Sequence, residues 1–349
     1  MGVYRDVMIA TLPATLPSMP APASAVAIPP LLALSAAALV IGVLLRSRAA
    51  ALVLDHPNQR SLHVAPTPRI GGLGVLAGIA AGTAAIDFAV DVRVLIALGI
   101  LLAVSLLDDL RSVGVVRRLL AHLAAAILAA AVFIHAEHGF AAAIAATLII
   151  TWMINLYNFM DGSDGLAGSM AVCGFGVYGI AALCAGDPAF AALNFSVAAA
   201  AAGFLLFNFP PARVFMGDAG AIPLGFLAAA CGLAGWQRGV WPLWFGAIVF
   251  SPFIVDATLT LAKRLARGDK VWQAHREHYY QRLVQSGWGH RKTLLAEAGL
   301  MTVVSAAALA GLRLDSAQQS GLLALVVIAY AVLITVLEHR LPPPATRNA

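Results

Sequence analysis

Charged residues are scarce in this chain. Only 11% of its 349 residues are Asp, Glu, Lys or Arg, whereas 61% are hydrophobic and the mean hydropathy is +0.87. An ordinary soluble protein is roughly 25% charged, and a chain with so few polar side chains cannot cover a water-soluble globule. The composition therefore excludes a soluble domain and indicates a protein that crosses a lipid bilayer several times.

Patterns typical of several other classes are also absent. Cys173, Cys184 and Cys231 lie in apolar segments without CxxC or Cys/His spacing, so neither a disulfide framework nor a zinc site is expected. No basic helix with interleaved aromatic residues accompanies the net charge of +5, and we expect no nucleic-acid partner. Residues 1–23 hold one arginine and lack the basic start of a signal peptide, so we expect a poorly ordered lead-in.

Long apolar runs dominate the sequence. Their lengths and boundaries predict an all-α fold, a polytopic membrane helical bundle of about eleven transmembrane helices. Residues 24–337 are expected to form one membrane domain, followed by a tail at residues 338–349. The predicted spans lie near residues 24–45, 70–86, 94–107, 119–135, 140–157, 165–183, 189–207, 219–235, 240–262, 293–311 and 319–337.

Positive charges fall mainly on one side of this predicted topology. Of the 22 lysines and arginines, only Arg5, Arg93, Arg238 and Arg313 belong to the other side. In membrane proteins the cytoplasmic loops carry the excess of basic residues. We therefore expect the N-terminus outside, with the basic loops and the C-terminal tail in the cytoplasm.

Unusual polar clusters gather on the predicted cytoplasmic side. They occupy five loops, and the convergence of these loops on one face would form an active site at the membrane surface. The loops read DHPNQRSLHVAPTPRIGG (55–72), LLDDLRSVGVVRR (106–118), NLYNFMDGSDGLAG (155–168), FNFPPARVFMGDAG (207–220) and AHREHYYQRLVQSGWGHRK (274–292).

Asp108 and Asp109 end an apolar run in the second loop. Ionisable groups near hydrocarbon are costly and often functional, although a helix end that reaches water would explain one isolated pair. Adjacent carboxylates also suit Mg²⁺, which prefers oxygen ligands and shares its shell with substrate phosphates. Ser112 stands where a prenyl-diphosphate DDxxD motif would need its third Asp, so that motif is excluded.

Asp161 and Asp164 lie three residues apart in the third loop, and each is followed by glycine. This spacing puts both carboxylates on one side of a helical turn, and the glycines let a ligand approach the backbone closely. An N-capped loop would explain one Asp and one Gly, but not the doubled pattern beside Asn155 and Asn158. The pattern predicts a loop that faces a ligand.

The fourth and fifth loops add further candidates. Asp218 lies between glycines at the start of an apolar run, where a helix N-cap is the alternative, and Phe215 could stack on a base or simply pack. Cationic groups in the fifth loop could clamp a diphosphate, although the excess of positive charge on this side also explains its arginines. Without a third ligand its histidines are a poor zinc site. These groups are His275, Arg276, His278 and Arg282.

Together the five loops resemble those of the polyprenyl-phosphate N-acetylhexosamine-1-phosphate transferases, which start O-antigen, teichoic acid and peptidoglycan lipid intermediates. The resemblance covers residues 30–337 and is greatest to the O-antigen and enterobacterial-common-antigen initiators. It implies transfer of a sugar-1-phosphate from a UDP-HexNAc sugar to undecaprenyl phosphate, with Mg²⁺ or Mn²⁺, giving UMP. It also implies a multi-pass protein of the bacterial inner membrane with a cytoplasmic active site, and a homodimer is compatible with it.

The resemblance also implies a role for each residue singled out above. Metal binding and catalysis fall to Asp218 and to the acidic pair, Asp108 and Asp109. The nucleotide-side motif consists of Asp161 and Asp164 with Asn155 and Asn158. Phe215 matches the residue that stacks on uracil. The diphosphate-contacting motif of the last loop is His275, Arg276 and His278.

Two departures from the family concern its substrates. Val64 occupies the position of a Lys that precedes TPxxGG in the peptidoglycan branch, so its role would pass to Arg69, Arg60 or His63. The last-loop sequence HREHYYQRL is less rich in histidine than that of GlcNAc-specific members. It is more similar to members suggested to use 6-deoxy-HexNAc donors.

Two other functions stay open at this point. A transporter or flippase also places polar groups in a helical bundle, but its site lies near the bilayer midplane between related halves, and no internal repeat is visible here. A lipid-diphosphate phosphatase would use water as the acceptor and would need no nucleotide pocket. Release of UMP that depends on the lipid distinguishes the transferase from both.

Overall fold

Helices make up nearly all of the computed structural model, which describes residues 23–342 except 52, 58–61, 63, 64, 112, 135 and 274. The predicted all-α class is confirmed; only the two-residue strands β1 (Leu54–Asp55) and β2 (Thr67–Pro68) pair, antiparallel, among these residues. The long helices are α1 (Ala23–Arg46), α2 (Gly71–Ala84), α3 (Val92–Arg111), α4 (Val115–Phe133), α5 (Gly139–Met160), α6 (Leu166–Cys184), α7 (Pro188–Asn208), α8 (Asp218–Gln237), α10 (Ser251–Ala266), α12 (Gly289–Gly311) and α13 (Ser316–Arg340). The short ones are η1 (Arg48–Ala51), η2 (Ala136–His138), α9 (Trp244–Val249), α11 (Tyr279–Leu283) and the π-helical turn η3 (Val284–Trp288).

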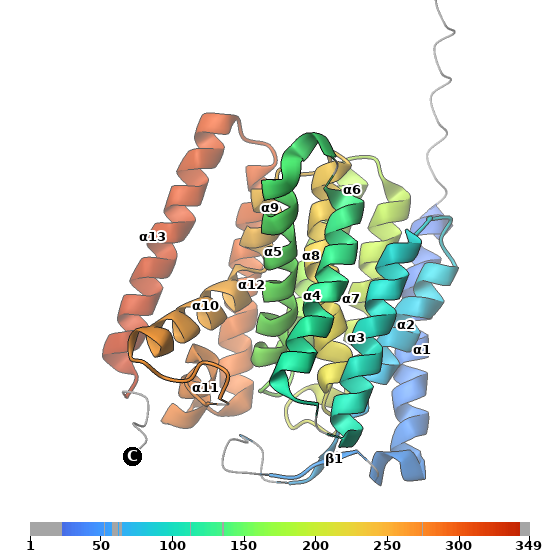
Figure 1. The fold of residues 1–349 in the computed structure, drawn as a ribbon, viewed down its shortest axis with the longest axis vertical. Helices are drawn as coiled ribbons and strands as arrows, with labels where there is room; N and C mark the ends of the chain where they lie inside the picture. The colour runs from blue at the N-terminus through green and yellow to red at the C-terminus, as the bar shows by residue number, and fades with distance from the viewer. Residues whose placement is uncertain are drawn as a thin grey trace, which may run out of the picture.

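Within the described part of the chain, eight helical stretches are long and apolar enough to cross a membrane. The protein is therefore a multi-pass membrane protein. The span predicted at 240–262 is wrong as a single helix, because the chain breaks at Phe250 between α9 and α10, and α10 crosses the bundle obliquely (Figure 1). Pro252 at the start of α10 explains the break, since proline has no backbone N–H to donate to the carbonyl four residues earlier in α9.

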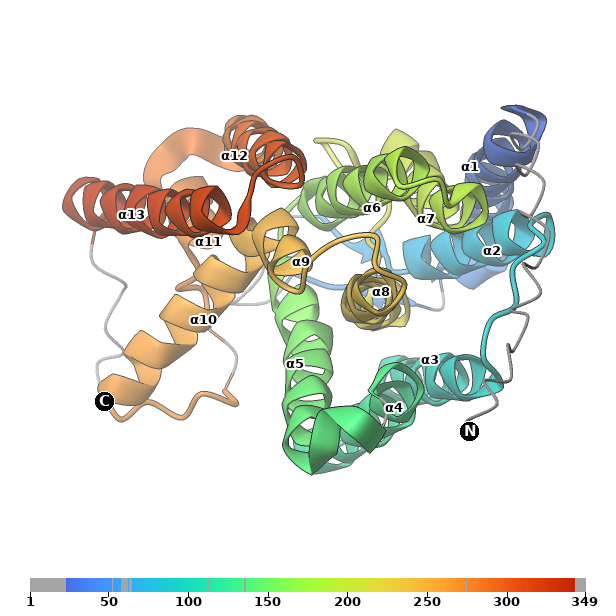
Figure 2. The same ribbon diagram turned by 90° about the horizontal axis from the view of Figure 1, so that it is seen from above.

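Helix α8 lies at the centre of the bundle, with α5, α6, α7, α2, α3 and α4 around it (Figure 2). Small residues allow this, because close packing rather than a hydrophobic effect drives helix association in lipid. A Cβ on Gly225 would lie 2.5 Å from the backbone oxygen of Met153, and one on Gly72 would lie 2.3 Å from the backbone nitrogen of Gly220. These contacts fix α5 and the start of α2 against α8.

The polar loops meet at one end of the bundle. Helices α1, α3, α5 and α7 end there and α2, α4, α6 and α8 begin there, at the lower end in Figure 1, where β1 also lies. The predicted convergence of the loops on one face is confirmed for their described residues.

Candidate active site

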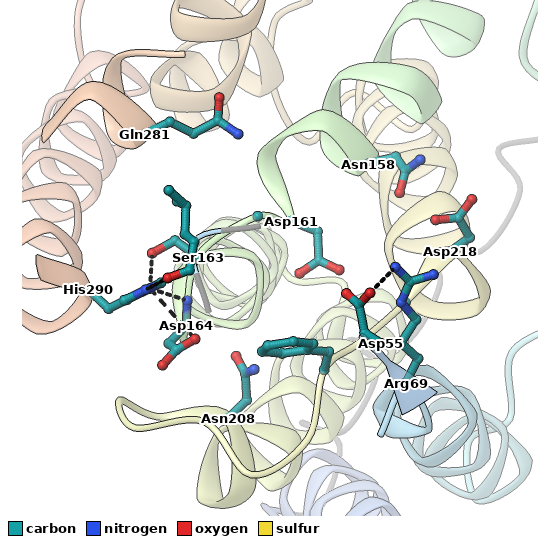
Figure 3. A pocket seen from close by; sticks show the side chains of 14 residues that line it. Asp55, Arg69, Asn158, Asp161, Ser163, Asp164, Asn208, Asp218, Gln281 and His290 are labelled. Carbon is teal, nitrogen blue, oxygen red and sulfur yellow. Dashed lines mark hydrogen bonds and ion pairs between the residues drawn. The ribbon is translucent and has the colours of Figure 1, made fainter. Parts of the chain in front are cut away.

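A cavity of about 280 Å³ opens at this end of the bundle (Figure 3). Four of the five polar loops contribute to its wall, and none of the described side chains of the loop at 106–118 does. Its lining residues are Asp55, Leu62, Arg69, Asn158, Asp161, Gly162, Ser163, Asp164, Asn208, Phe215, Gly217, Asp218, Gln281 and His290.

Backbone pairing between two loops sets the positions of Arg69, Phe215 and Asp218. The N–H of Phe215 donates to the carbonyl of Pro68 at 2.8 Å, and the N–H of Gly71 donates back to the carbonyl of Phe215 at 2.9 Å. Gly217 then turns the chain into α8 with a φ of +70°, a conformation that favours glycine. Asp218 therefore begins α8 at a fixed place beside Arg69.

Two carboxylates face the cavity from different helices. Asp161 follows α5 and Asp218 begins α8, with Asn158 of α5 beside it (Figure 3). Burial, together with the negative charge of Asp218, raises the pKa of Asp161 well above its ordinary value, against the opposing effect of Arg69. Arg69 itself pairs with Asp55 at 2.7 Å. The site thus holds two nearby acids whose mutual repulsion a cation would relieve.

The donor set fits a hard divalent cation. No group of three or more His, Cys, Asp or Glu side chains that could hold a metal by itself occurs among the described residues. Asp161 and Asp218 nevertheless offer carboxylate oxygens on one cavity wall, and Asn158 adds an amide oxygen. Mg²⁺ commonly takes one or two carboxylates and fills its shell with water and phosphate oxygens.

Asp108 lies behind this wall rather than in it. Its carboxylate accepts from the N–H of Val113 at 2.5 Å and pairs with Arg118 at 2.6 Å, and the same guanidinium nitrogen of Arg118 lies 3.3 Å from Asp218. Arg118 therefore links Asp108 to the cavity. Asp109 lies in α3, and its side chain is outside the described part of the structure. Arg118 was not among the expected site residues, although a basic residue at the start of the next helix was available as a signal.

Asp164 ties the third loop to its neighbours. Its carboxylate accepts from the N–H of Ala212 at 2.9 Å and lies 3.6 Å from Nδ1 of His290. Asn208 makes a second tie, since its side chain accepts from the N–H of Gly165 and donates to the carbonyl of Val214, both at 2.8 Å. Of the two loop acids, Asp161 faces Asp218, and Asp164 mainly holds the loop in place.

None of the last-loop residues predicted to clamp a diphosphate lines the cavity. His278 is buried, and its Nδ1 lies 3.2 Å from a carboxylate oxygen of Asp256, which also accepts from the N–H groups of Tyr279 and Tyr280. Burial first, then the nearby His278 and Arg264, lower the pKa of His275 to about 3, so that His275 is neutral at pH 7. Arg276 is exposed, and His63 and Arg60 lie outside the described residues.

The last loop instead contributes Gln281 and His290, which the sequence argument missed. Nδ1 of His290 lies 2.9 Å from Oγ of Ser163 and accepts from the N–H of Asp164 at 3.2 Å, which leaves Nε2 to donate to the carbonyl of Leu62 at 3.3 Å. His290 thereby joins the first turn of α12 to the first and third loops. A histidine just after the glycine that begins α12 was the available signal.

Asn155, predicted beside Asn158 as a substrate contact, also lies outside the cavity wall. One turn further into α5, its Oδ1 lies 3.2 Å from Nδ1 of His122 on α4. The two asparagines therefore have different neighbours, since Asn158 lies beside Asp218 (Figure 3) and Asn155 contacts a buried histidine.

Comparison with known proteins agrees with these motifs. Residues 92–235 match the family model described as glycosyl transferase family 4. The chain is 28% identical over 260 residues, 69% of its length and 72% of the relative's, to the "Probable undecaprenyl-phosphate N-acetylglucosaminyl 1-phosphate transferase" of Bacillus subtilis (strain 168). It is 28% identical over 334 residues to the "Decaprenyl-phosphate N-acetylglucosaminephosphotransferase" of Mycobacterium tuberculosis (strain CDC 1551 / Oshkosh), covering 81% and 82% of the two chains. It is also 26% identical over 303 residues, 80% and 82%, to the "Undecaprenyl-phosphate alpha-N-acetylglucosaminyl 1-phosphate transferase" of Yersinia pestis.

Proposed function

We propose a sugar-phosphate transfer for this chain, which belongs to the polyprenyl-phosphate N-acetylhexosamine-1-phosphate transferases of glycosyl transferase family 4. The donor is a UDP-HexNAc sugar and the acceptor is undecaprenyl phosphate, so the products are undecaprenyl-diphosphate-HexNAc and UMP. The reaction starts a cell-surface polysaccharide such as an O-antigen.

One observation carries the proposal: Asp161 and Asp218 face one cavity together with Arg69, Asn158 and Phe215. Phosphoryl transfer needs positioning and neutralisation of charge more than covalent help from the protein. A bound Mg²⁺ would neutralise diphosphate charge between these acids and polarise the phosphorus under attack. The aromatic ring of Phe215 offers a face on which a uracil can stack.

The chain's own groups account for the remaining requirements. Arg69 can donate to a phosphate oxygen from the cavity wall, since its planar guanidinium suits phosphate geometry. An oxygen of the lipid phosphate attacks the phosphorus that carries the sugar, that P–O bond forms, and the bond to the UMP oxygen breaks. In this scheme the lipid phosphate is itself the nucleophile, so the sugar-phosphate passes to it directly.

The cavity faces the cytoplasm of a bacterial inner membrane in this proposal. Most lysines and arginines belong to the end of the bundle where the cavity opens, and few belong to the opposite end. Such an excess of basic residues is typical of the cytoplasmic side. UDP-sugars and lipid phosphate meet only at that surface. The membrane location of the acceptor explains why the site lies at helix ends.

The test is release of UMP by purified protein with Mg²⁺, undecaprenyl phosphate and a panel of UDP-HexNAc donors, including 6-deoxy sugars. We expect UMP and a lipid-linked sugar with at least one donor, and neither product without the lipid. Absence of UMP with every donor, in protein shown to be folded, would contradict the proposal. Equal UMP release without lipid would point to a hydrolase instead.

A further inference from the structure

A buried polar cluster lies behind the acidic wall of the cavity, between α4 and α5. His122 on α4 is 1% exposed, although it sits in an apolar helix. Its Nδ1 lies 3.2 Å from Oδ1 of Asn155, whose Nδ2 donates to the carbonyl of Thr151 at 2.7 Å. An imidazole at such a place is costly in a membrane bundle unless it has a partner.

These contacts determine which nitrogen of His122 carries the proton. The amide of Asn155 uses its N–H on Thr151, so its oxygen faces His122 as an acceptor. The proton of the neutral imidazole must then sit on Nδ1, which leaves Nε2 as an acceptor. Nε2 is buried and has no hydrogen-bond partner among the described residues.

A matching donor lies one helical turn away. Arg118 precedes His122 by four residues on α4, so both side chains lie on the same face of the helix. Its Nε–H is likewise buried and has no partner among the described residues, whereas its NH1 contacts Asp108 at 2.6 Å and Asp218 at 3.3 Å. The contact with Asp218 is the longer and weaker of the two.

We propose that His122 positions Arg118 by accepting its Nε–H when a divalent cation takes Asp218. The inference rests on the proposed function, in which Asp218 holds a cation. A cation and a guanidinium cannot share one carboxylate without repulsion, so Arg118 must withdraw toward Asp108. The acceptor on His122 stabilises the withdrawn position and so favours cation binding. Asn155 fixes the tautomer that makes this possible.

The test measures the dissociation constant for Mg²⁺ alone by titration calorimetry on the detergent-solubilised full chain. In His122→Leu, Arg118 competes better for Asp218, and we expect binding weaker by about three- to tenfold, the value of one hydrogen bond. His122→Gln retains an acceptor and should stay within about twofold of wild type. The control Asn194→Leu removes another buried, unpaired polar atom, on α7, and should leave the constant unchanged.

Two further variants keep the test decisive if His122→Leu fails to fold. Asn155→Leu removes the acceptor that fixes the tautomer and should weaken Mg²⁺ binding in the same direction. In an Arg118→Met background, replacing His122 by Leu or Gln should change nothing further, because His122 acts only through Arg118. An additive loss in that background would overturn the inference.

The outcomes also separate this inference from the proposed function. If the wild type binds no Mg²⁺, the proposed metal site fails, and the role of His122 fails with it. If the wild type binds Mg²⁺ and His122→Leu binds it equally, only the positioning role is overturned.

Discussion

The two walls of the cavity differ in which of their residues the sequence motifs predicted. One wall comes from the loops between residues 55 and 218, where Asp161, Asp218, Arg69 and Phe215 face the space that the sequence motifs predicted. The other comes from the last loop, where Gln281 and His290 face the cavity and the predicted His275 and His278 do not. Both loops are polar and lie at the same end of the bundle, so composition alone cannot account for the difference.

The difference lies in what precedes each polar residue. Asp161 and Asp218 directly adjoin the ends of α5 and α8, so helix packing delivers them to the cavity. The last loop follows α10, and Asp256 within α10 contacts His278 and accepts from the backbone N–H groups of Tyr279 and Tyr280 at the start of α11. The position of a polar residue at the end of a packed helix is thus easier to predict from the sequence. A polar residue in a long loop can instead be held by a buried acid from another segment.

The largest expected effect concerns the first wall. Asp218→Asn removes a carboxylate charge from the proposed cation site, and we expect turnover to fall by roughly 10²- to 10³-fold. Asp164→Asn makes the same chemical change in a residue that mainly holds a loop, and should cost less than about tenfold. UMP release by variants with wild-type thermal unfolding measures both. Near-wild-type turnover of Asp218→Asn would show that this carboxylate has no role in the reaction.

The second effect concerns how the last loop is held. Asp256 accepts from two backbone N–H groups and lies beside His278, and Asp256→Asn leaves a buried donor unsatisfied. We expect the free energy of unfolding to fall by about 1–3 kcal/mol. Asp269→Asn, at an exposed pair with Arg267, should cost under about 1 kcal/mol. Denaturant unfolding followed by tryptophan fluorescence makes the comparison, and equal losses would show that Asp256 does not organise the loop.

The third effect compares two histidines of the last loop. His290→Ala breaks the ties to Ser163, Asp164 and Leu62 at the cavity, and we expect KM for the UDP-sugar to rise by about tenfold. His275→Ala lies away from the cavity and should change KM by less than about threefold. The reverse order would mean that the last loop rearranges to bring His275 onto the substrate.

The smallest effect is a dependence of stability on pH. His275 has a pKa of about 3 in the folded protein, against 6.5 ordinarily, so below pH 6.5 the unfolded chain binds a proton that the folded chain does not. This residue therefore lowers stability as pH falls from 6.5 toward 3 and has no effect above that range. His275→Gln should match the wild-type thermal unfolding temperature at pH 7.5 and exceed it at pH 5. An equal decline in both proteins would contradict the shift.

The sequence predicted the helices well because apolar run length is a local property. It failed at residues 240–262, where proline divides an unbroken apolar run. It also gave no sign that His278 contacts Asp256, which lies in a different segment. Arg118 and His122 escaped notice for the same reason: a basic residue and a histidine in an apolar helix have no meaning until Asp218 and Asn155 lie beside them.

The sequence by itself determined that this protein lies in a membrane, which loops are polar and which family its motifs resemble. Those properties follow from hydropathy, charge asymmetry and short motifs, each of which is legible along the chain. Only the tertiary structure decided which of the polar residues share a cavity. Helix packing around α8 places Asp161 and Asp218 in the same cavity. His278 is held outside it by Asp256, and His122 contacts Asn155 between α4 and α5. Distances between segments far apart in sequence depend on that packing, and no local pattern encodes them.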